Sequence, residues 1–160
     1  MDGFGNLGGV TVDALGFIYV ANFRDGVWRI SPDGEAKRLT DALYGSSGNA
    51  VDSRGTLYQS NFNGNSIVKV GRDGTVEPFV DEGLNGPVGL TFGGDGTLYV
   101  CNCSGNSIST VTPDGVVEEL VRDPLLNCPN GITTDESGTL YVVNFNSPDV
   151  VRIMPDGAVD

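Results

Sequence analysis

The side chains that could carry out chemistry in this sequence are carboxylates, amides and three cysteines, because its 160 residues include no histidine. Triad hydrolases need a histidine as general base, so Ser-His-Asp and Cys-His catalysis are excluded in this chain. Three cysteines without a histidine also supply too few ligands for a closed zinc site. Carboxylate and amide oxygens instead suit a hard divalent cation such as Ca²⁺.

The chain is strongly acidic, with 21 Asp and Glu residues against 9 Lys and Arg residues and a formal net charge of −12. An acidic surface repels the phosphates of nucleic acids and is poorly suited to an anionic membrane. We therefore expect neither a nucleic acid nor a membrane as a partner. The charge has two interpretations, which are solubility of the folded chain and attraction of a cation.

Four tyrosines mark an internal repeat of about 40 residues. Each lies in the pattern Gly-x-x-Tyr-x-x-Asn, and an Asp-Gly turn follows about 14 residues after the tyrosine. The period of about 40 residues between one tyrosine and the next is typical of repeat proteins. The tyrosines are Tyr19, Tyr58, Tyr99 and Tyr141. Aligned on them, the repeats span about 1–44, 45–85, 86–127 and 128–160.

Short apolar segments alternate with turns rich in Gly, Asn and Asp inside each repeat, which is typical of antiparallel strands joined by hairpins. The tyrosine segment Leu140-Tyr141-Val142-Val143 is apolar on both faces of a strand, so it must be covered on both sides. Four-stranded units stacked face to face are the blades of a β-propeller. We therefore predict an all-β propeller in a single domain, 1–160, built from four repeats of four-stranded antiparallel blades.

The last repeat stops at Ala158-Val159-Asp160, where its fourth strand should begin, and nothing before Gly8 reads as a strand that could replace it. The chain is then either a small four-bladed ring with imperfect closure or part of a larger ring, and we favour the second. Blade edges and faces left open would lead to self-association. The first residues, Met1 to Gly5, lack the basic and apolar regions of a signal peptide. Localisation therefore stays open, with a secreted or periplasmic longer parent as one expectation.

The motif Pro129-Asn130-Gly131-Ile132, followed by Gly138-Thr139-Leu140-Tyr141-Val142, resembles the SMP-30/gluconolactonase-like propellers. The repeated pattern ending in Pro-Asp-Gly is also similar to bacterial NHL-repeat proteins. The resemblance covers essentially the whole chain and implies a six-bladed ring. For the first family it also implies a divalent cation, usually Ca²⁺, in the central channel and hydrolysis of lactones or related esters. Similar repeats occur in histidine-dependent lyases, whose chemistry this histidine-free chain cannot perform.

The cation ligands implied by this resemblance are Glu, Asn or Asp side chains just before a glycine of the innermost strands. The residues at these places are Gly8, Ser47, Val88 and Asn130, and only Asn130 matches the pattern. Asn49 lies one residue after its glycine, out of phase with Asn130. A single neutral amide does not hold Ca²⁺, so a working site would need carboxylates from other blades. Asn130 is the one predicted metal ligand, and a plain turn residue is the alternative.

Two further groups of residues have structural interpretations. The repeated asparagines are expected to hold turns through bonds from side chain to backbone, because they occupy one position in every repeat. They are Asn22, Asn61, Asn102 and Asn144. Cys101 and Cys103 lie on one face of a strand and do not pair easily with each other. Both are expected to be buried, and a bridge from Cys128 to either one is the alternative.

Two functional hypotheses follow from these observations. The first is an NHL-type propeller without complete catalytic machinery, which binds a small-molecule or protein ligand at its channel face. The second is part of a Ca²⁺-dependent lactone or ester hydrolase. Non-ligand residues at three of the four positions before the glycines favour the first, so whether the chain is an enzyme stays open.

Overall fold

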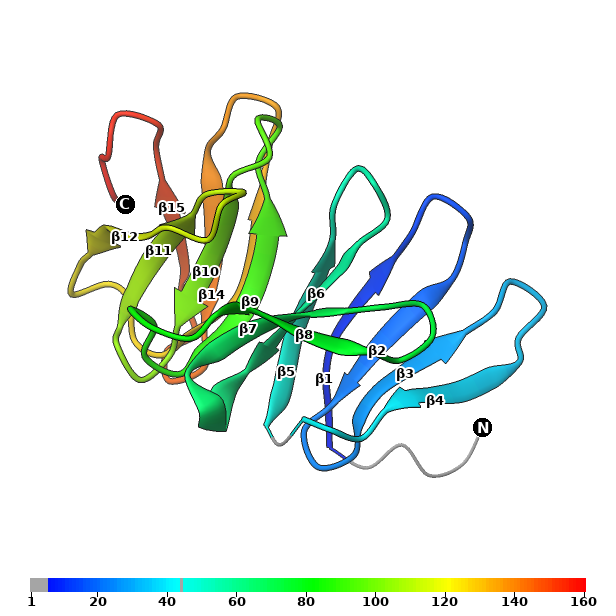
Figure 1. Cartoon of the computed structure of the whole chain (residues 1–160). Coiled ribbons are helices and arrows are strands. Elements are labelled where there is room, and N and C mark those ends of the chain that lie inside the picture. The colour runs from blue at the N-terminus through cyan, green and yellow to red at the C-terminus, as the bar shows by residue number, and fades with distance from the viewer. Residues whose placement is uncertain (1–5, 44) are drawn as a thin grey trace.

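The protein is described here by a computed structural model that covers residues 6–43 and 45–160, and these residues form an all-β propeller arc of four blades (Figure 1). Met1 to Gly5, on which the signal-peptide expectation rests, lie outside the described residues. Three blades are four-stranded sheets and the fourth is a three-stranded sheet, each with consecutive antiparallel strands.

The strands follow one another in the same order in every blade. Blade 1 contains β1 (Leu7–Val12), β2 (Ile18–Asn22), β3 (Gly26–Ile30) and β4 (Ala36–Thr40). Blade 2 contains β5 (Ser46–Val51), β6 (Leu57–Asn61), the 3₁₀ turn η1 (Phe62–Gly64), β7 (Ser66–Val70) and β8 (Val76–Val80). Blade 3 contains β9 (Pro87–Phe92), β10 (Leu98–Asn102), β11 (Ser107–Val111) and β12 (Val117–Arg122). Blade 4 contains β13 (Pro129–Thr134), β14 (Leu140–Asn144) and β15 (Val150–Ile153).

Blade 4 ends with the beginning of an outer strand. Val159 forms a bridge with Ile153, and the backbones of Arg152 and Asp160 exchange two hydrogen bonds of 2.7 and 3.0 Å. The sequence placed the start of a fourth strand at these residues, and the structure confirms it.

In blades 1, 2 and 4 the turn before the tyrosine strand is stabilised by an aspartate six residues ahead of the tyrosine. Its carboxylate accepts backbone N–H groups two and four residues later, as in an Asx turn, and also accepts the tyrosine hydroxyl. The pairs are Asp13–Tyr19 (3.2 Å), Asp52–Tyr58 (3.5 Å) and Asp135–Tyr141 (3.2 Å). In blade 3 this position holds Gly93, and Asp95 accepts the N–H of Thr97 instead.

Three apolar clusters lie between neighbouring blades. The face that carries Tyr19, Ala21 and Val27 packs on blade 2, and corresponding faces of blades 2 and 3 pack on the next blade. On the other side of these interfaces, blade 2 contributes Leu57, Val68 and Val70 to the contact with blade 1. Blade 3 contributes Leu98 and Val100 to the contact with blade 2, and blade 4 contributes Leu140 and Val142 to the contact with blade 3. The tyrosine strands of blades 2 and 3 are therefore covered on both sides. In blade 4, for which the prediction was made, only the face with Leu140 and Val142 is covered, and Tyr141 and Val143 are 37% and 46% exposed.

The innermost strands are close enough to require glycine. A Cβ atom on Gly8, Gly48 or Gly89 would collide with a backbone carbonyl of the next inner strand. This close approach aligns β1, β5, β9 and β13 as neighbours around the central channel. A Cβ on Gly9 would also come within 2.9 Å of the backbone of β5, so the aligned glycines of repeats 1 to 3 have a packing role, whereas a Cβ on Gly131 would meet only the Val143 side chain.

Candidate functional site

The four innermost strands line a cavity of about 830 Å³, which lies within the range typical of small-molecule sites. We call it the channel cavity. All four blades contribute to it, through residues of β1, β5, β9 and β13 and through Phe23 and Phe145, which follow β2 and β14. The cavity is the place where the resemblance puts a functional site.

The described residues that line the channel cavity include no charged side chain, although the chain carries a net charge of −12. Its polar side chains are those of Asn6, Ser47, Asn49 and Asn130, together with backbone exposed at the glycines. Leu7, Val10, Leu90, Ile132 and the two phenylalanines supply apolar surface. The arrangement offers hydrogen bonds and aromatic contacts to an uncharged group.

The structure brings two of the four aligned positions to the cavity with a polar side chain. Asn130 is exposed, and its side chain makes no hydrogen bond within the described parts of the chain. Ser47 also lines the cavity. Val88, by contrast, is 5% exposed and packs in the cluster between blades 3 and 4.

These residues do not fit a calcium ion by themselves. Ca²⁺ takes six to eight oxygen ligands with carboxylates among them, and the described lining supplies amides and one hydroxyl. No group of three Asp, Glu or Cys side chains that could hold a metal occurs in residues 6–43 and 45–160. Asn130 therefore remains a proposed ligand whose companions would have to come from elsewhere.

Asn49 has a different environment from Asn130. It is 7% exposed, and its Nδ2 donates to the carbonyl oxygens of Gly9 and Tyr19 in blade 1, both at 3.4 Å. Opposite it in the sheet lies Gln59, whose Nε2 donates to the Gly48 carbonyl at 2.7 Å. Asn49 Oδ1 and Gln59 Oε1 are buried without a hydrogen-bond partner in the described structure.

Sequence reasoning missed this buried polar pair. Its signal was present in the repeat alignment, because Gln59 occupies a position that holds Val20, Val100 and Val142 in the other blades. A buried amide at a position otherwise reserved for valine marks a local exception to the apolar core.

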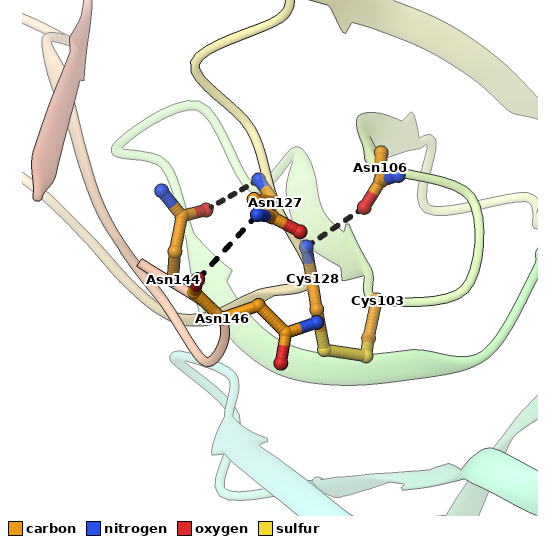
Figure 2. Close-up of a disulfide and its surroundings, with 6 residues drawn as sticks. All are labelled: Cys103, Asn106, Asn127, Cys128, Asn144 and Asn146. Atoms are coloured by element: carbon orange, nitrogen blue, oxygen red, sulfur yellow. Dashed lines mark hydrogen bonds between the residues drawn. A yellow bond between two sulfur atoms is a disulfide. The ribbon is translucent and has the colours of Figure 1, made fainter. Parts of the chain in front are cut away.

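Asn22, Asn102 and Asn144 make the expected bonds from side chain to backbone, whereas Asn61 Oδ1 is buried without a partner in the described structure. Asn144 Oδ1 accepts the N–H of Asn127 at 2.9 Å (Figure 2). Its Nδ2 donates to the Leu125 carbonyl at 2.9 Å. Asn102 Oδ1 likewise accepts the N–H of Asn85 at 3.1 Å. These bonds of Asn102 and Asn144 hold the segment that enters the blade. The turn after the strand, which the sequence suggested, is held in blade 1, where the N–H of Arg24 donates to Asn22 Oδ1 at 3.1 Å.

A disulfide between Cys103 and Cys128 joins blade 3 to the entry of blade 4 (Figure 2). The backbone N–H of Cys128 also donates to Asn106 Oδ1 at 2.7 Å, from the turn after β10. Cys101 is free and fully buried, and burial raises the pKa of its thiol. The expectation of a buried cysteine is confirmed for Cys101 and is wrong for Cys103, which is only partly buried and forms the alternative bridge to Cys128.

Comparison with known proteins identifies the fold. No protein-family model matches the sequence, and no curated protein is significantly similar to it. Similar solved structures include virginiamycin B lyase from Staphylococcus aureus, with 20% identity and a TM-score of 0.78, covering 99% of this chain and 56% of that chain. A gluconolactonase from Xanthomonas campestris has 23% identity and a TM-score of 0.82, covering 96% of this chain and 60% of that one. A chain of the nidogen/laminin complex has 22% identity and a TM-score of 0.84, covering 94% and 61%.

These neighbours confirm the propeller fold and include the gluconolactonase type that the motifs resemble. They are two kinds of enzyme and a chain of a protein–protein complex, so the shared fold leaves the function open. The chain spans between 56% and 61% of the length of these neighbours. Within the described residues, no helix is long and apolar enough to cross a membrane.

Proposed function

We propose that this chain is a binding module that takes an uncharged group of a small molecule or protein in its channel cavity, without complete catalytic machinery of its own. The observation that carries the proposal is the chemistry of the lining. Amides, a hydroxyl, backbone groups and two phenylalanines surround the cavity, and no charged side chain does so among the described residues.

The chemistry of the lining sets the expected ligand class. A charged ligand group would lose its hydration in the cavity and find no ion partner among the described lining residues. An uncharged polar group would keep its hydrogen bonds through Asn130 and the exposed glycine backbone, while Phe23 and Phe145 would cover its apolar parts. The match to a chain of the nidogen/laminin complex is consistent with a propeller that works by binding.

A second candidate is part of a Ca²⁺-dependent lactone or ester hydrolase, within a six-bladed ring. The observation in its favour is Asn130, whose side chain is exposed at the cavity in the Pro-Asn-Gly-Ile context. Its amide oxygen could serve as one ligand if carboxylates came from further blades. A bound cation would then polarise the carbonyl of the substrate as a Lewis acid.

A calorimetric titration with CaCl₂ separates the two candidates. We expect no binding heat at millimolar Ca²⁺ for the protein, because one amide is too weak a site. Binding at one ion per chain that disappears in Asn130→Ala would favour the hydrolase.

The binding function is tested directly by a fragment screen followed by NMR. Neutral polar fragments should shift the backbone amide signals of Gly48, Gly89 and Gly131, and charged analogues of the same fragments should not. Asn130→Phe, which removes the amide and narrows the cavity, should weaken these shifts, whereas Asn63→Phe at an exposed position in η1 should leave them intact. Equal binding of charged analogues would contradict the proposal.

A further inference from the structure

The two end blades expose opposite faces of the same blade architecture. In blade 1 the face turned away from blade 2 carries Val10, Val12, Ile18 and Val20, and we call it the leading face. In blade 4 the face turned away from blade 3 carries Tyr141, Val143 and Val150, and we call it the trailing face. Figure 1 shows blade 1 and blade 4 at opposite sides of the molecule.

Two of the three trailing-face positions, those of Val143 and Val150, are buried in every other blade. The counterparts of Val143 are Ala21, Ser60 and Cys101, and those of Val150 are Val27, Ile67 and Ile108, all at 0% exposure. Val143 itself is 46% exposed and Val150 is 62% exposed. Blade 4 thus presents the surface that a following blade covers elsewhere in the chain.

The leading face shows the complementary pattern. The counterparts of Val20 are Gln59, Val100 and Val142, all at 0% exposure beneath the preceding blade. On the leading face Val10 is 67% exposed and Val12 is 60% exposed. Apolar side chains cluster here across β1 and β2, because Val10 lies opposite Val20 and Val12 lies opposite Ile18. Exposed apolar patches of this kind mark interaction surfaces.

The three interfaces inside the chain show which surface fits which. In each of them, a tyrosine-bearing face packs on the Leu/Val face of the next blade. The trailing face is of the first type and the leading face of the second, so the two are complementary, and each chain carries one of each. Blade 1 of a second copy can therefore pack on blade 4 through the same kind of contact that joins neighbouring blades inside the chain.

The interface between blades 1 and 2 adds one polar contact, at a position where Lys69 of blade 2 and Thr110 of blade 3 make no such bond to the next blade among the described residues. Arg29 lies opposite Tyr19 in the sheet, and its Nη1 donates to the carbonyl of Arg72 in blade 2 at 3.0 Å. Arg152 lies opposite Tyr141 in the same way. In the repeat alignment Pro32 corresponds to Arg72, so a second copy on the trailing face would bring the carbonyl of its Pro32 toward Arg152. Arg152 is now paired with Asp160 at the exposed rim.

We propose that the trailing face of blade 4 binds the leading face of blade 1 of a second copy, head to tail. Such a heterologous interface gives rings where the rotation closes and open chains where it does not. The association is driven by burial of the exposed valines and of Tyr141. A hydrogen bond from Arg152 to the Pro32 carbonyl of the second copy would fix the relative orientation of the two chains.

The test is sedimentation velocity over a dilution series, with one charged substitution on each face. The wild-type protein should show a mass that rises with concentration. Val10→Asp on the leading face and Val143→Asp on the trailing face should each be monomeric alone. An equimolar mixture of the two variants should form a dimer and nothing larger, because each variant retains the face that the other lacks. Val116→Asp, at an exposed valine outside both faces, is the matched control and should associate like the wild type.

Three results would overturn the proposal. One is a wild-type protein that stays monomeric at every concentration. Another is association of Val143→Asp alone, which would mean that leading faces bind each other. The third is a mixture that stays monomeric although both variants unfold cooperatively on heating. If either variant fails to fold, Val12→Asp and Val150→Asp replace them on the same faces with the same expected outcomes.

Discussion

Gln59 lies directly opposite Asn49 in the register of β5 and β6, and the two amides form a polar pair buried between blade 1 and blade 2. Their Nδ2 and Nε2 atoms donate to backbone carbonyls, while Asn49 Oδ1 and Gln59 Oε1 find no donor in the described structure. The same two positions in blade 3 hold Leu90 and Val100. A buried acceptor without a donor costs stability, so this interface is weaker than its counterpart between blades 2 and 3.

We predict that the double variant Asn49→Leu/Gln59→Val is at least as stable as the wild type and gains up to about 2 kcal/mol in free energy of unfolding. It replaces the polar pair by the apolar pair of blade 3. Gln59→Val alone should be destabilised by about 1 kcal/mol, because the Gly48 carbonyl loses its Nε2 donor while Asn49 Oδ1 stays buried without one. Urea unfolding of the wild type, both single variants and the double variant gives a double-mutant cycle. The prediction would be contradicted if the losses of unfolding free energy in the two single variants simply added up in the double variant.

The disulfide should account for a large share of the stability of blade 4. Cys103 and Cys128 are separated by 25 residues, and closing a loop of this size in the unfolded chain stabilises the fold by roughly 3 kcal/mol. Reduction, or the variant Cys103→Ser/Cys128→Ser, should lower the free energy of unfolding by this order. Urea denaturation with and without dithiothreitol measures it, and Cys101→Ala, which keeps the bridge, is the control that should remain sensitive to the reductant.

Thiol counting checks the pairing itself. The native protein should show no thiol that reacts with Ellman's reagent, because Cys101 is buried and its raised pKa leaves little thiolate. One thiol should react in denaturant and three after reduction. Reaction of three thiols in denaturant without reductant would show that the bridge is not formed.

Much of the fold was predictable because its signals are local. The spacing of the tyrosines and the Asp-Gly turns predicted the blades, since strand alternation and turn chemistry act within a few residues. The partner of Cys128 was not predictable, because the sequence pattern places Cys101 and Cys103 on one face of a strand, whereas β10 ends at Asn102 and Cys103 lies in the turn after it. The buried amide pair was not predicted, since its burial depends on how blade 1 packs on blade 2.

The candidate site was predicted in part. The sequence pointed to the residues just before the inner glycines, and Ser47 and Asn130 do line the channel cavity. Val88 occupies an equivalent place in the repeat but packs between blades 3 and 4. The phenylalanines that follow β2 and β14 were not recognised as lining residues. Their contribution depends on the path of the chain after the strand, which the repeat pattern does not specify.

Two asparagines should behave in opposite ways. Asn102 is 2% exposed and bonds to the N–H of Asn85 and to the hydroxyl of Ser109, so Asn102→Ala should cost about 2 to 3 kcal/mol of stability. Asn130→Ala should change stability by less than about 0.5 kcal/mol, since its exposed side chain holds nothing in the fold. Asn130→Ala should instead weaken fragment binding in the cavity. Equal losses of stability in urea unfolding would contradict this division of roles.

Alkaline unfolding should depend on the buried tyrosines. Burial raises the pKa of Tyr19 above its ordinary value of 10.0, and the Asp13 carboxylate, which accepts the Tyr19 hydroxyl, raises it further. The folded protein therefore holds this proton more tightly than the unfolded chain does. The resulting stability is fully present below pH 10.0 and is lost as the pH rises through the folded value.

Tyr19→Phe removes this titrating group, so its free energy of unfolding should fall less steeply than that of the wild type above pH 10.0. Urea unfolding at a series of alkaline pH values measures the slope, and tyrosinate absorbance follows the ionisation directly. Asp13→Asn provides the complementary test. It removes the negative charge beside the hydroxyl, so the pKa of Tyr19 should move back toward 10.0 and the tyrosinate signal should appear at a lower pH. An unchanged titration in Asp13→Asn would show that burial alone sets the pKa of Tyr19.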